Sequence, residues 1–423
     1  MGKSILQIPV QQLSRRDWDL VVAGAGPAGS TAAAHLAAKG ASVLLVDRAR
    51  FPREKVCGDG LVVDALRCLS RLGLLRAVAA EGHLVPGATI YSPSGLQTTA
   101  QGTFLTCRRE KLDRLIAQKA VERGAVFAQG QVESITCGQD GRAAFLLSGC
   151  DEPMTARVGM VSTGATTSLL RKELGSRNQR PSAAAIRCYV RSREHLDRML
   201  IVEDRSVLPG YGWIFPMGNN EYNVGVGAFY TDGKKFPDLK KTFSRFTREF
   251  GPARDMMEKA QSATPLKGGV LRCNLEGAPP FILPNILALG ECIGSTYACI
   301  GEGIGSAMET GELAAQAAWL ALSTGTTGAL DQYPRLVEAV LRSRHKHWHL
   351  AHRTLAKAWL NDLFVYRVER DPHMKMAMER ILNNTMDPIH ILWLRGAVQD
   401  WLTWPARTFA AIRQSRRGAS KKK

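Results

Sequence analysis

DWDLVVAGAGPAGSTAAAHLAAKGASVLLVDR, residues 17–48, is the stretch with the clearest structural pattern in this chain. The apolar run DLVVA leads into the glycine-rich GAGPAG, and the alanine-rich STAAAHLAA that follows has strong helix propensity. SVLLVD is a second apolar run of strand length. The order is strand, tight turn, helix and strand, which is the beginning of a parallel α/β sheet.

The glycines of the turn, Gly24, Gly26 and Gly29, have the GxGxxG spacing of a dinucleotide-binding site. We expect Gly24 to form the turn, Gly26 to let the backbone approach a pyrophosphate, and Gly29 to let the helix pack closely on the strand. The pyrophosphate would lie at the helix N-terminus, where free N–H groups attract negative charge. Asp47 ends the second strand, where it can accept from a ribose hydroxyl, and Arg48 follows it. The motif alone leaves FAD and NAD open.

A second glycine-rich segment, PNILALGECIGSTYACIGEGIGSAMETGELAAQAAWLAL at 284–322, lies far downstream. It predicts a short buried strand, a turn at Gly290 and a long helix of small residues that opens with GEGIG. Gly301, Gly303 and Gly305, on either side of Ile304, would let the backbone approach a flat ring, while the helix dipole faces an electron-rich atom of that ring. The segment therefore predicts a second helix N-terminus at the cofactor.

Between these motifs, TCRREKLDRLIAQKAVERGAVF at 106–127 predicts a helix that runs from Arg109 past Asp113 and ends at Gly124, followed by a strand. In this order, the GAGPAG motif with its following acid, the RxxLD pattern of this helix and the LGExxGxxxxxxGEGI segment resemble the p-hydroxybenzoate hydroxylase superfamily of FAD-dependent oxidoreductases.

Two further stretches resemble the geranylgeranyl reductase branch of that superfamily more closely. They are FPREKVCGDGL at 51–61 and GYGWIFPMGNNEYNVGVG at 210–227. That branch typically shows CG(D/G)G after the second strand and YxWxFP in the substrate sheet, and the likeness runs from about Asp17 into the C-terminal helices. It implies an α/β fold with an FAD-binding Rossmann-like domain of the GR2 type, an antiparallel substrate-binding sheet and C-terminal helices.

The resemblance also divides the chain and places the cofactor. We expect FAD as the cofactor, with NAD(P)H or another reductant as the electron donor. The expected FAD contacts are Gly24, Gly26, Gly29, Asp47, Arg48, Arg109, Gly290, Glu291, Gly301, Gly303 and Ile304. The expected parts are the FAD-binding domain at 17–175, with an inserted substrate-side segment at about 76–105, the substrate-binding sheet at 176–264, the second part of the FAD-binding domain at 265–326, and a helical region with a basic tail at 327–423.

Three positions depart from the superfamily pattern. Thr163 stands where the family has an aspartate, although Ser168 and Arg171 match it. Glu291 replaces the aspartate of the usual Gly-Asp pair and can still accept from ribityl or ribose hydroxyls, and Ala298 replaces a proline. The missing carboxylate at Thr163 bears on how a nicotinamide donor is handled.

The CGDG stretch supplies the catalytic candidates, Cys57 and Asp59. Gly58 and Gly60 allow this loop to lie against the flavin ring without a side-chain clash. Cys57 can be a proton donor, a flavin contact or a small packing group, and Asp59 can be an acid or a turn residue.

The stretches YGWIFPMG and EYNVGVGAF alternate like the two strands of a hairpin, with Tyr211, Trp213 and Phe215 on one face. An aromatic face over a flavin makes an apolar slot for a prenyl chain or an aromatic ring. The same three residues can also be ordinary core.

The resemblance implies reduction of C=C bonds in a geranylgeranyl-type or other prenyl substrate. The alternative is a flavin monooxygenase that hydroxylates an aromatic group, including one carried by a peptide or protein, because both reactions run on this fold. A flavin halogenase is less favoured, since YGWIFP departs from the WxWxIP of those relatives. A flavoprotein without enzymatic activity is the weakest reading.

The net charge of +18 and the pI of about 9.7 describe partners more than fold. An anionic membrane surface or an acidic protein fits this charge. A nucleic acid is not expected, because the chain has no zinc-finger spacing and no ribonucleoprotein motif. Aromatic and basic residues alternate near the C-terminus like an interfacial membrane segment: Trp401, Trp404, Arg407, Phe409, Ile412, Arg413, Arg416 and Arg417 with three terminal lysines.

The nine cysteines form no CxxC pair, which fits a reducing compartment and argues against a zinc site. His345, His349 and His352 share one helical face but lack an acidic partner on it, so we expect no metal. The N-terminus has no secretory pattern, and no run of about 18 apolar residues occurs. We therefore expect a cytoplasmic protein, peripheral on the inner face of a membrane. The sequence leaves the oligomeric state open.

Overall fold

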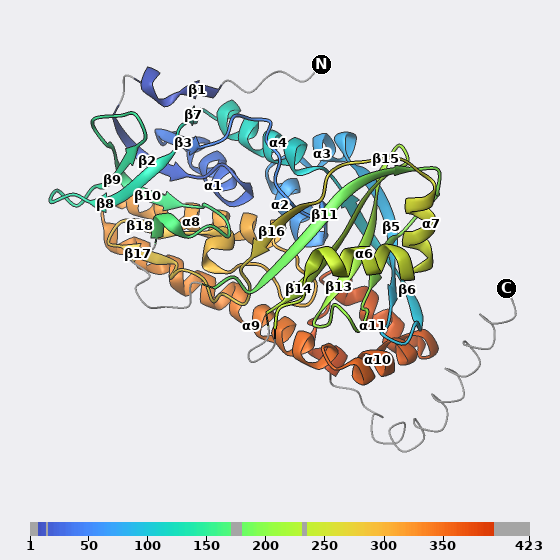
Figure 1. Cartoon of the computed structure of the whole chain (residues 1–423). Helices are drawn as coiled ribbons and strands as arrows, with labels where there is room; N and C mark the ends of the chain where they lie inside the picture. The colour runs from blue at the N-terminus through green and yellow to red at the C-terminus, as the bar shows by residue number, and fades with distance from the viewer. Residues whose placement is uncertain (1–6, 14–15, 171–179, 231–234, 393–423) are drawn as a thin grey trace, which may run out of the picture.

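The computed structural model describes residues 7–13, 16–170, 180–230 and 235–392. They form two sheets that meet at an angle, with helices around both (Figure 1). The first sheet has the strand order β1-β7-β3-β2-β10-β18-β17, and the hairpin of β8 and β9 joins it at β10. The second has the order β15-β11-β14-β13-β12-β5-β6-β4, with β16 paired to β11.

The first sheet is the nucleotide-binding sheet predicted from the opening motif. Strands β1, β7, β3, β2, β10 and β18 run parallel, with Leu20 of β2 opposite Val43 of β3. Its strands are β1 (Gln7–Pro9), β2 (Asp17–Ala23), β3 (Val43–Asp47), β7 (Val126–Gln129), β8 (Val132–Cys137), β9 (Ala143–Leu147), β10 (Met154–Val161), β17 (Phe281–Leu283) and β18 (Ile286–Ala288). Every residue of β3 is buried, as expected of a strand covered on both faces.

Three helices contribute to the hydrophobic core of the first sheet. They are α1 (Pro27–Ala37), α4 (Arg109–Glu122) and α8 (Ile304–Thr324), and α1 packs between the other two. A Cβ on Gly311 of α8 would lie 2.4 Å from the carbonyl oxygen of Ala28 in α1, so the two helices touch backbone to backbone. The predicted helix from Arg109 and the predicted strand, turn and helix around Gly290 are confirmed.

The second sheet is mainly antiparallel. Its strands are β4 (Gly60–Leu61), β5 (His83–Tyr91), β6 (Gln97–Thr106), β11 (Ala183–Ser192), β12 (Met199–Val202), β13 (Gly210–Gly218), β14 (Glu221–Phe229), β15 (Ala260–Ala263) and β16 (Lys267–Leu271). The predicted hairpin is confirmed as β13 and β14, joined through Asn219 and Asn220, which both have positive φ. Two such residues give the turn that matches the twist of a hairpin.

Helices cover one face of this second sheet and leave part of the other free. Ile214, Val224 and Val226 pack against Phe243 and Phe246, which belong to α6 (Leu239–Glu249). Helix α7 (Gly251–Glu258) extends the same cover, and Figure 1 shows both helices in front of the sheet. Because side chains alternate along a strand, the residues between these positions point to the opposite face.

The C-terminal helices run from the first sheet to the second (Figure 1). They are α9 (Gln332–Leu355), α10 (Ala358–Arg370), α11 (Pro372–Leu382) and α12 (Ile389–Leu392). Asp362 of α10 accepts from the hydroxyl of Ser92 at 2.7 Å and from the N–H of Ser94 at 2.8 Å, which ties this helix to the β5–β6 turn. The shorter helices are α2 (Val63–Arg71), α3 (Leu75–Glu81) and the 3-10 turns η1 (Val10–Gln12), η2 (Ser168–Leu170), η3 (Gly290–Ile293) and η4 (Thr327–Asp331).

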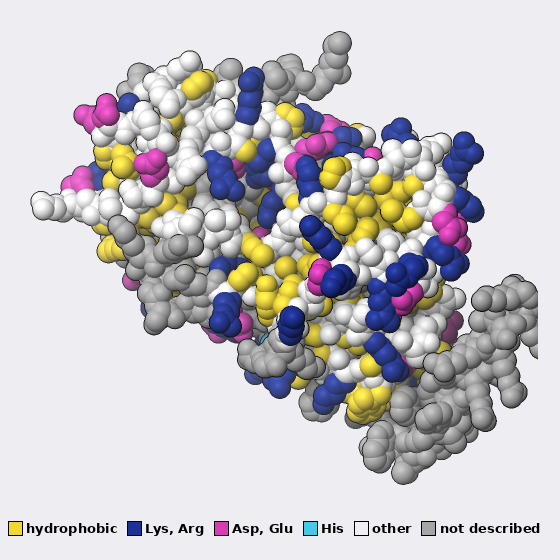
Figure 2. Space-filling view, in the orientation of Figure 1, with side chains coloured by type: hydrophobic (Ala, Val, Ile, Leu, Met, Phe, Trp, Pro, Cys, Tyr) yellow, Lys and Arg dark blue, Asp and Glu magenta, His cyan; other side chains and the backbone are white. Residues whose placement is uncertain are grey.

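Within the described ranges, no helix combines the length and the apolarity that crossing a bilayer requires. The predicted interfacial segment from Trp401 onward lies outside the described residues, as does Arg171. On the face drawn in Figure 2, lysine and arginine side chains are spread widely, with fewer acidic ones between them.

Candidate functional site

A cavity of about 620 Å³ lies between the two sheets and the C-terminal helices. Its two parts differ in chemistry. One part, which we call the cofactor groove, is lined by Gly24, Gly26, Asp47, Arg48, Gly290 and Glu291. The other, the apolar arm, is lined by Ile90, Phe104, Met199, Ile201, Phe364 and Met378.

The GAGPAG turn shapes the floor of the cofactor groove. Gly24 has a φ of 109°, and a Cβ there would lie 2.4 Å from the carbonyl oxygen of Ser162. A Cβ on Gly29 would lie 2.0 Å from the carbonyl oxygen of Gly24, so this glycine packs the helix and does not line the cavity. Gly26 differs, because the nearest atom to its Cβ position is a guanidinium nitrogen of Arg53 at 3.8 Å. The groove is therefore open where a pyrophosphate would approach the N-terminus of α1.

Asp47 is buried at the end of β3, and backbone groups fix its carboxylate. One oxygen accepts from the N–H of Ala25 at 2.9 Å and the other from the N–H of Ala49 at 2.9 Å. Arg53 adds an ion pair at 3.5 Å. The carboxylate thus joins the β2–α1 turn to the end of β3, and it lines the groove beside Arg48, where a ribose would reach it.

The second helix N-terminus opens onto the same cavity. Gly303 caps α8, and Gly301 and Ile304 line the cavity beside it. The hydroxyl of Tyr211 donates to the carbonyl of Ile300 at 2.6 Å, which ties this turn to the substrate sheet. Two glycine-bounded helix N-termini and one acid at a strand end fit FAD, because a helix N-terminus attracts the negative charge of a pyrophosphate and the acid can accept from a ribose hydroxyl.

Arg109 lies behind the CGDG loop, with its charge already matched. Its guanidinium donates to both oxygens of Asp113, at 2.7 and 2.9 Å, and Asp113 also pairs with Arg53 at 3.0 Å. Arg109 lines the cavity, and its positive charge lowers the pKa of the Cys57 thiol, against the larger raising effect of burial. Toward the cavity, the charge of this residue therefore acts on Cys57.

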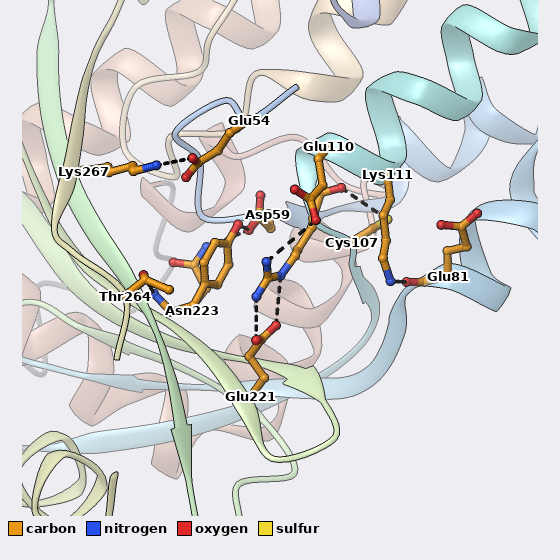
Figure 3. Close-up of polar contacts among 12 residues, drawn as sticks. Glu54, Asp59, Glu81, Cys107, Glu110, Lys111, Glu221, Asn223, Thr264 and Lys267 are labelled. Carbon is orange, nitrogen blue, oxygen red and sulfur yellow. Dashed lines mark hydrogen bonds and ion pairs between the residues drawn. The ribbon is translucent and has the colours of Figure 1, made fainter. Parts of the chain in front are cut away.

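Asp59 is the centre of a buried hydrogen-bond network. It has a φ of 63° and no exposed surface. One carboxylate oxygen accepts from the hydroxyl of Tyr189 at 2.5 Å and from the amide of Asn223 at 2.8 Å, and Figure 3 shows Asp59 and Asn223 side by side. Burial raises the pKa of Asp59 to about 6, against the lowering effect of these two bonds. Asp59 is thus a turn residue and a titratable group at once.

The same network fixes the loop that carries Cys57. The amide of Asn223 also donates to the carbonyl of Cys57 at 2.8 Å, and Trp213 donates to the other side of that amide at 2.9 Å. Burial raises the pKa of the Cys57 thiol, which keeps it protonated at neutral pH. The structure therefore brings Cys57, Asp59 and Trp213 together through one asparagine.

Tyr211, Trp213 and Phe215 lie on the cavity face of β13 and touch in sequence. Their ring centroids are 6.0 Å apart for Tyr211 and Trp213 and 6.2 Å apart for Trp213 and Phe215. Trp213 lies over Gly225 of β14, where a Cβ would come within 2.2 Å of the indole. The loop at Gly58 rests on Phe215, at 3.3 Å from its Cβ position. The aromatic face thus adjoins both the CGDG loop and the apolar arm.

The structure also places the other residues that the sequence analysis named. The hydroxyl of Thr163 donates to the carbonyl of Thr166 at 2.7 Å, and Thr163 and Ser168 line the cavity, whereas Ala298 is buried in the core. His345 packs on Tyr297 with ring centroids 4.5 Å apart, and His352 packs on Phe229 at 4.4 Å. Each of these histidines therefore packs against an aromatic ring in a tilted arrangement.

Sequence reasoning missed several polar residues of the cavity. Asn223 lies within the predicted strand EYNVGVGAF, and Tyr189 and Glu203 belong to no motif. Tyr189 lies between the guanidinium groups of Arg108 and Arg187, at 3.9 and 4.2 Å from its ring. Burial raises the pKa of Glu203 to about 7, and Asn361 donates to it. A polar residue inside an alternating strand, as in EYNVGVG, was the one signal that pointed to Asn223.

Comparison with known proteins agrees with this geometry. Residues 17–175 match the FAD binding domain family, and residues 186–264 match the geranylgeranyl reductase catalytic domain. The chain is 33% identical over 344 residues to a menaquinone reductase of Mycolicibacterium smegmatis, which covers 76% of this chain and 80% of that protein. It is 28% identical over 326 residues to digeranylgeranylglycerophospholipid reductase 1 of Methanosphaera stadtmanae, with 71% and 75% covered.

Solved structures show the same fold. A geranylgeranyl bacteriochlorophyll reductase-like protein from Thermoplasma acidophilum superposes with a TM-score of 0.72 at 21% identity, covering 85% of this chain and 93% of that one. The flavin-dependent brominase Bmp2 gives 0.72 at 21% identity, with 91% and 99% covered. The shared fold alone does not distinguish a reductase from a halogenase. The 33% identity to the menaquinone reductase, over 76% of this chain, favours the reductases. This chain belongs to the geranylgeranyl reductase family of FAD-dependent oxidoreductases.

Proposed function

We propose that this protein reduces C=C bonds in the prenyl chain of a membrane lipid, with a menaquinone-type prenyl quinone as the first substrate to test. The names of its relatives support this choice. One acts on menaquinone and the others on digeranylgeranyl phospholipids, and these lipids differ in their head groups but share isoprenoid chains. The isoprenoid chain is therefore the part that these substrates share.

The observation that carries the proposal is the apolar arm. Its side chains come from the second sheet and from α10 and α11, and they continue the packed clusters around Phe104, Met199 and Leu382. The arm opens next to Phe215 and the CGDG loop, so an extended hydrocarbon in it would reach the aromatic face. A prenyl chain gains about 0.8 kcal/mol for each CH₂ group that leaves water, which suits such a site.

The residues of the chain bind, orient and protect the reacting bond. Reduced FAD, when bound, supplies a hydride, and the second hydrogen arrives as a proton. The thiol of Cys57 holds a proton at its sulfur, while Asn223 and Asp59 fix the loop that carries it. The apolar arm excludes water from the double bond, and Trp213 holds the asparagine in place.

The experiment is anaerobic reoxidation of the FAD-loaded protein after reduction with dithionite. We expect a menaquinone or a geranylgeranyl lipid to restore the oxidised flavin spectrum, with a product that mass spectrometry finds heavier by one H₂ per reduced bond. Cys57→Ala should keep FAD and slow this reoxidation by about 100-fold or more if the thiol delivers the proton. Indifference to every prenyl lipid would overturn the proposal.

A second measurement uses oxygen, because the monooxygenase alternative relies on the same reduced flavin. A lasting hydroperoxide absorbance after mixing with air, together with no response to prenyl lipids, would favour hydroxylation of an aromatic group. NAD(P)H as the electron donor stays a prediction, and reduction of the flavin by NADH and by NADPH tests it directly.

The membrane partner also stays a proposal. The net charge of +18 and the basic side chains in Figure 2 suit an anionic lipid surface, where a prenyl lipid resides. Sedimentation with vesicles that contain an anionic phospholipid, compared with neutral vesicles, tests it. Equal binding to both kinds of vesicle would remove the electrostatic argument.

A further inference from the structure

Three neighbouring strands, β5, β12 and β13, line the cavity with apolar and aromatic side chains, and Glu203 adds a carboxyl group at the end of β12. Side chains alternate along a strand, so Met199, Ile201 and Glu203 point to the same face, and all three line the cavity. Ile201 lies opposite Trp213 of β13 and beside Ile90 of β5. The strand pairing therefore forms an apolar track along the cavity that ends at an acid.

The two ends of this track meet different parts of the molecule. At one end, the Cβ position of Gly60 in the CGDG loop lies 3.5 Å from Phe215 and 3.6 Å from Met199. At the other end, the register places Tyr211 opposite Glu203, two residues beyond the pair of Ile201 and Trp213. A strand rises about 3.3 Å per residue, so Glu203 lies about 13 Å along β12 from Met199.

The carboxyl group of Glu203 is held by one oxygen and accessible at the other. Its Oε2 accepts from the amide of Asn361, and that amide also donates to the carbonyl of Leu355 at 3.2 Å, which fixes its orientation. Its Oε1 accepts no hydrogen bond within the described part of the chain, and unlike the buried Oδ1 of Asn361 it keeps accessible surface. Glu203 thus presents one oxygen to the cavity.

The surroundings of this oxygen suit a hydroxyl group. The opposite residue, Tyr211, already donates its proton to the carbonyl of Ile300 at 2.6 Å. Among the described residues no cation pairs with Glu203, and an ammonium ligand would have to lose its water in an apolar track, which costs more than a neutral group does. A hydroxyl can donate to a carboxylate and can also accept from a carboxylic acid, so it fits either protonation state of Glu203.

We propose that Oε1 of Glu203 binds a hydroxyl group at the polar end of the substrate, and that this contact sets which double bond lies at the CGDG loop. The chain would run from Glu203 past Ile201 and Trp213 to the loop. The substrate class is then a prenyl alcohol or a prenyl quinol, the reduced form of a quinone, and not a hydrocarbon or an ether. The inference rests on the proposed function for the reaction, but the binding contact can be tested without turnover.

The first test compares two ligands, geranylgeraniol and its methyl ether, on the oxidised FAD-loaded protein. At about pH 8.5, above the pKa of about 7 to which burial raises Glu203, the carboxylate accepts from the alcohol, whereas the ether has no proton to donate. We expect a Kd about tenfold higher for the ether, the size expected for a hydrogen bond to a charged group. The change in flavin absorbance on binding measures both constants. Equal Kd values in the wild type would overturn the proposal.

Variants at Glu203 separate the hydrogen bond from the shape of the track. Glu203→Leu has no hydrogen-bonding atom, so the preference for the alcohol should disappear. Glu203→Gln keeps an oxygen for Asn361 and offers an N–H group to either ligand, so both should bind within about threefold of the wild-type alcohol. This variant decides the question if thermal melting shows that the leucine variant folds poorly. A tenfold preference that survives in either variant would overturn the proposal.

Asp204→Asn is the matched control for these variants. Asp204 is the next residue in the chain, its carboxylate accepts from the N–H of Ser206 at 2.7 Å, and it does not line the cavity. The asparagine can still accept this hydrogen bond, so the preference for the alcohol should stay within about twofold of the wild type. Loss of the preference in this control would assign the effect to the chain segment and not to Glu203.

The second test locates the reduced bond. After reaction of the reduced protein with geranylgeraniol, mass-spectrometric fragmentation should show one position of reduction in the wild type and in Asp204→Asn, and several positions in Glu203→Leu. The same single position in Glu203→Leu would show that the contact does not set the register. If geranylgeraniol and every other prenyl lipid leave the reduced wild-type flavin unchanged, the proposed function fails, and the ratio of the two Kd values still decides whether Glu203 binds a hydroxyl.

Discussion

The cofactor groove and the apolar arm are parts of one cavity, yet they are built in different ways. The groove is lined by the glycine-rich turn after β2, by Asp47 and Arg48 at the end of β3, and by Gly290 and Glu291 of η3. The arm is made of single side chains from β5, β6, β12, α10 and α11. A glycine packed against backbone, as Gly24 is, has no room for an added Cβ, whereas apolar side chains can be exchanged for others of similar size. The comparison shows why a fixed cofactor and a variable substrate can share one fold.

The largest effect should come from the glycine-rich turn beside the groove, at Gly29. In Gly29→Ala the new Cβ would lie 2.0 Å from the carbonyl oxygen of Gly24 and 2.3 Å from the hydroxyl of Ser162. Neither atom can move far, because both belong to packed strand ends. We expect a loss of about 3 kcal/mol or more in the free energy of unfolding, at the upper end for overpacked cores. Denaturant unfolding measures it.

Gly26→Ala is the matched variant, because its Cβ has open space apart from Arg53 at 3.8 Å. Its stability should stay within about 1 kcal/mol of the wild type, while FAD affinity falls by about tenfold or more, since the methyl group occupies the path of the pyrophosphate. Titration of the apoprotein with FAD measures the affinity. Unchanged affinity would place the pyrophosphate elsewhere and break the description of the groove.

A second test concerns Glu203, which lies where the second sheet meets the C-terminal helices. Its folded pKa of about 7 is above the value of about 4.3 in an unfolded chain. Below about pH 4 both states hold the proton, and between about pH 4 and about pH 7 only the folded state does. The free energy of unfolding therefore falls as pH rises through this window.

Glu203→Gln removes this dependence while Asn361 keeps an oxygen to donate to. Relative to the wild type, the variant should gain about 1 to 3 kcal/mol between pH 4 and pH 8, reduced because Glu203 faces the cavity. Thermal melting at several pH values measures the difference. Glu338→Gln, an exposed residue paired with Arg342 at 2.8 Å, should show no such trend, and an equal trend would remove the role given to burial.

The smallest effect should come from the apolar arm. Phe364→Ala removes a ring that lines the arm, and we expect KM for a prenyl lipid to rise by about tenfold, since an apolar ring contributes about 1.5 kcal/mol or more to burial. The kcat and the FAD affinity should remain unchanged. Steady-state kinetics with a prenyl lipid measure both constants.

Trp359→Ala is the control on the same helix, because Trp359 is 45% exposed and does not line the cavity. It should leave KM unchanged. If both variants raise KM equally, the effect belongs to the docking of α10 and not to the arm. A fall in kcat without a change in KM would show that Phe364 acts on the reacting bond.

Much of the nucleotide-binding half follows from local sequence. The pattern around Gly24 predicts strand, turn, helix and strand because its apolar runs and helix formers are contiguous, and the structure has them as β2, α1 and β3. The hairpin of Tyr211 and Trp213 follows from alternation with period two. FAD follows from the spacing of the glycines together with the resemblance.

The polar network and the apolar arm were decided by tertiary structure alone. Asp59 and Tyr189 are 130 residues apart in the chain, and Glu203 and Asn361 are 158 apart. No periodicity relates such positions, because each lies in an element whose own pattern is complete without the other. Burial then sets their pKa values, and burial depends on every segment packed around them.

Glu302 shows the boundary between the two kinds of information. The sequence by itself determined that GEGIG opens a helix, because glycine spacing and helix propensity are local properties of a few adjacent residues. Only the fold decided that the acid within it, Glu302, is 7% exposed, that this residue lines a cavity, and that Arg344 is already paired with Asp64 and Glu309. The physical reason is that the protonation of a carboxyl group depends on its solvent and its charged neighbours, which only the packing of distant segments supplies.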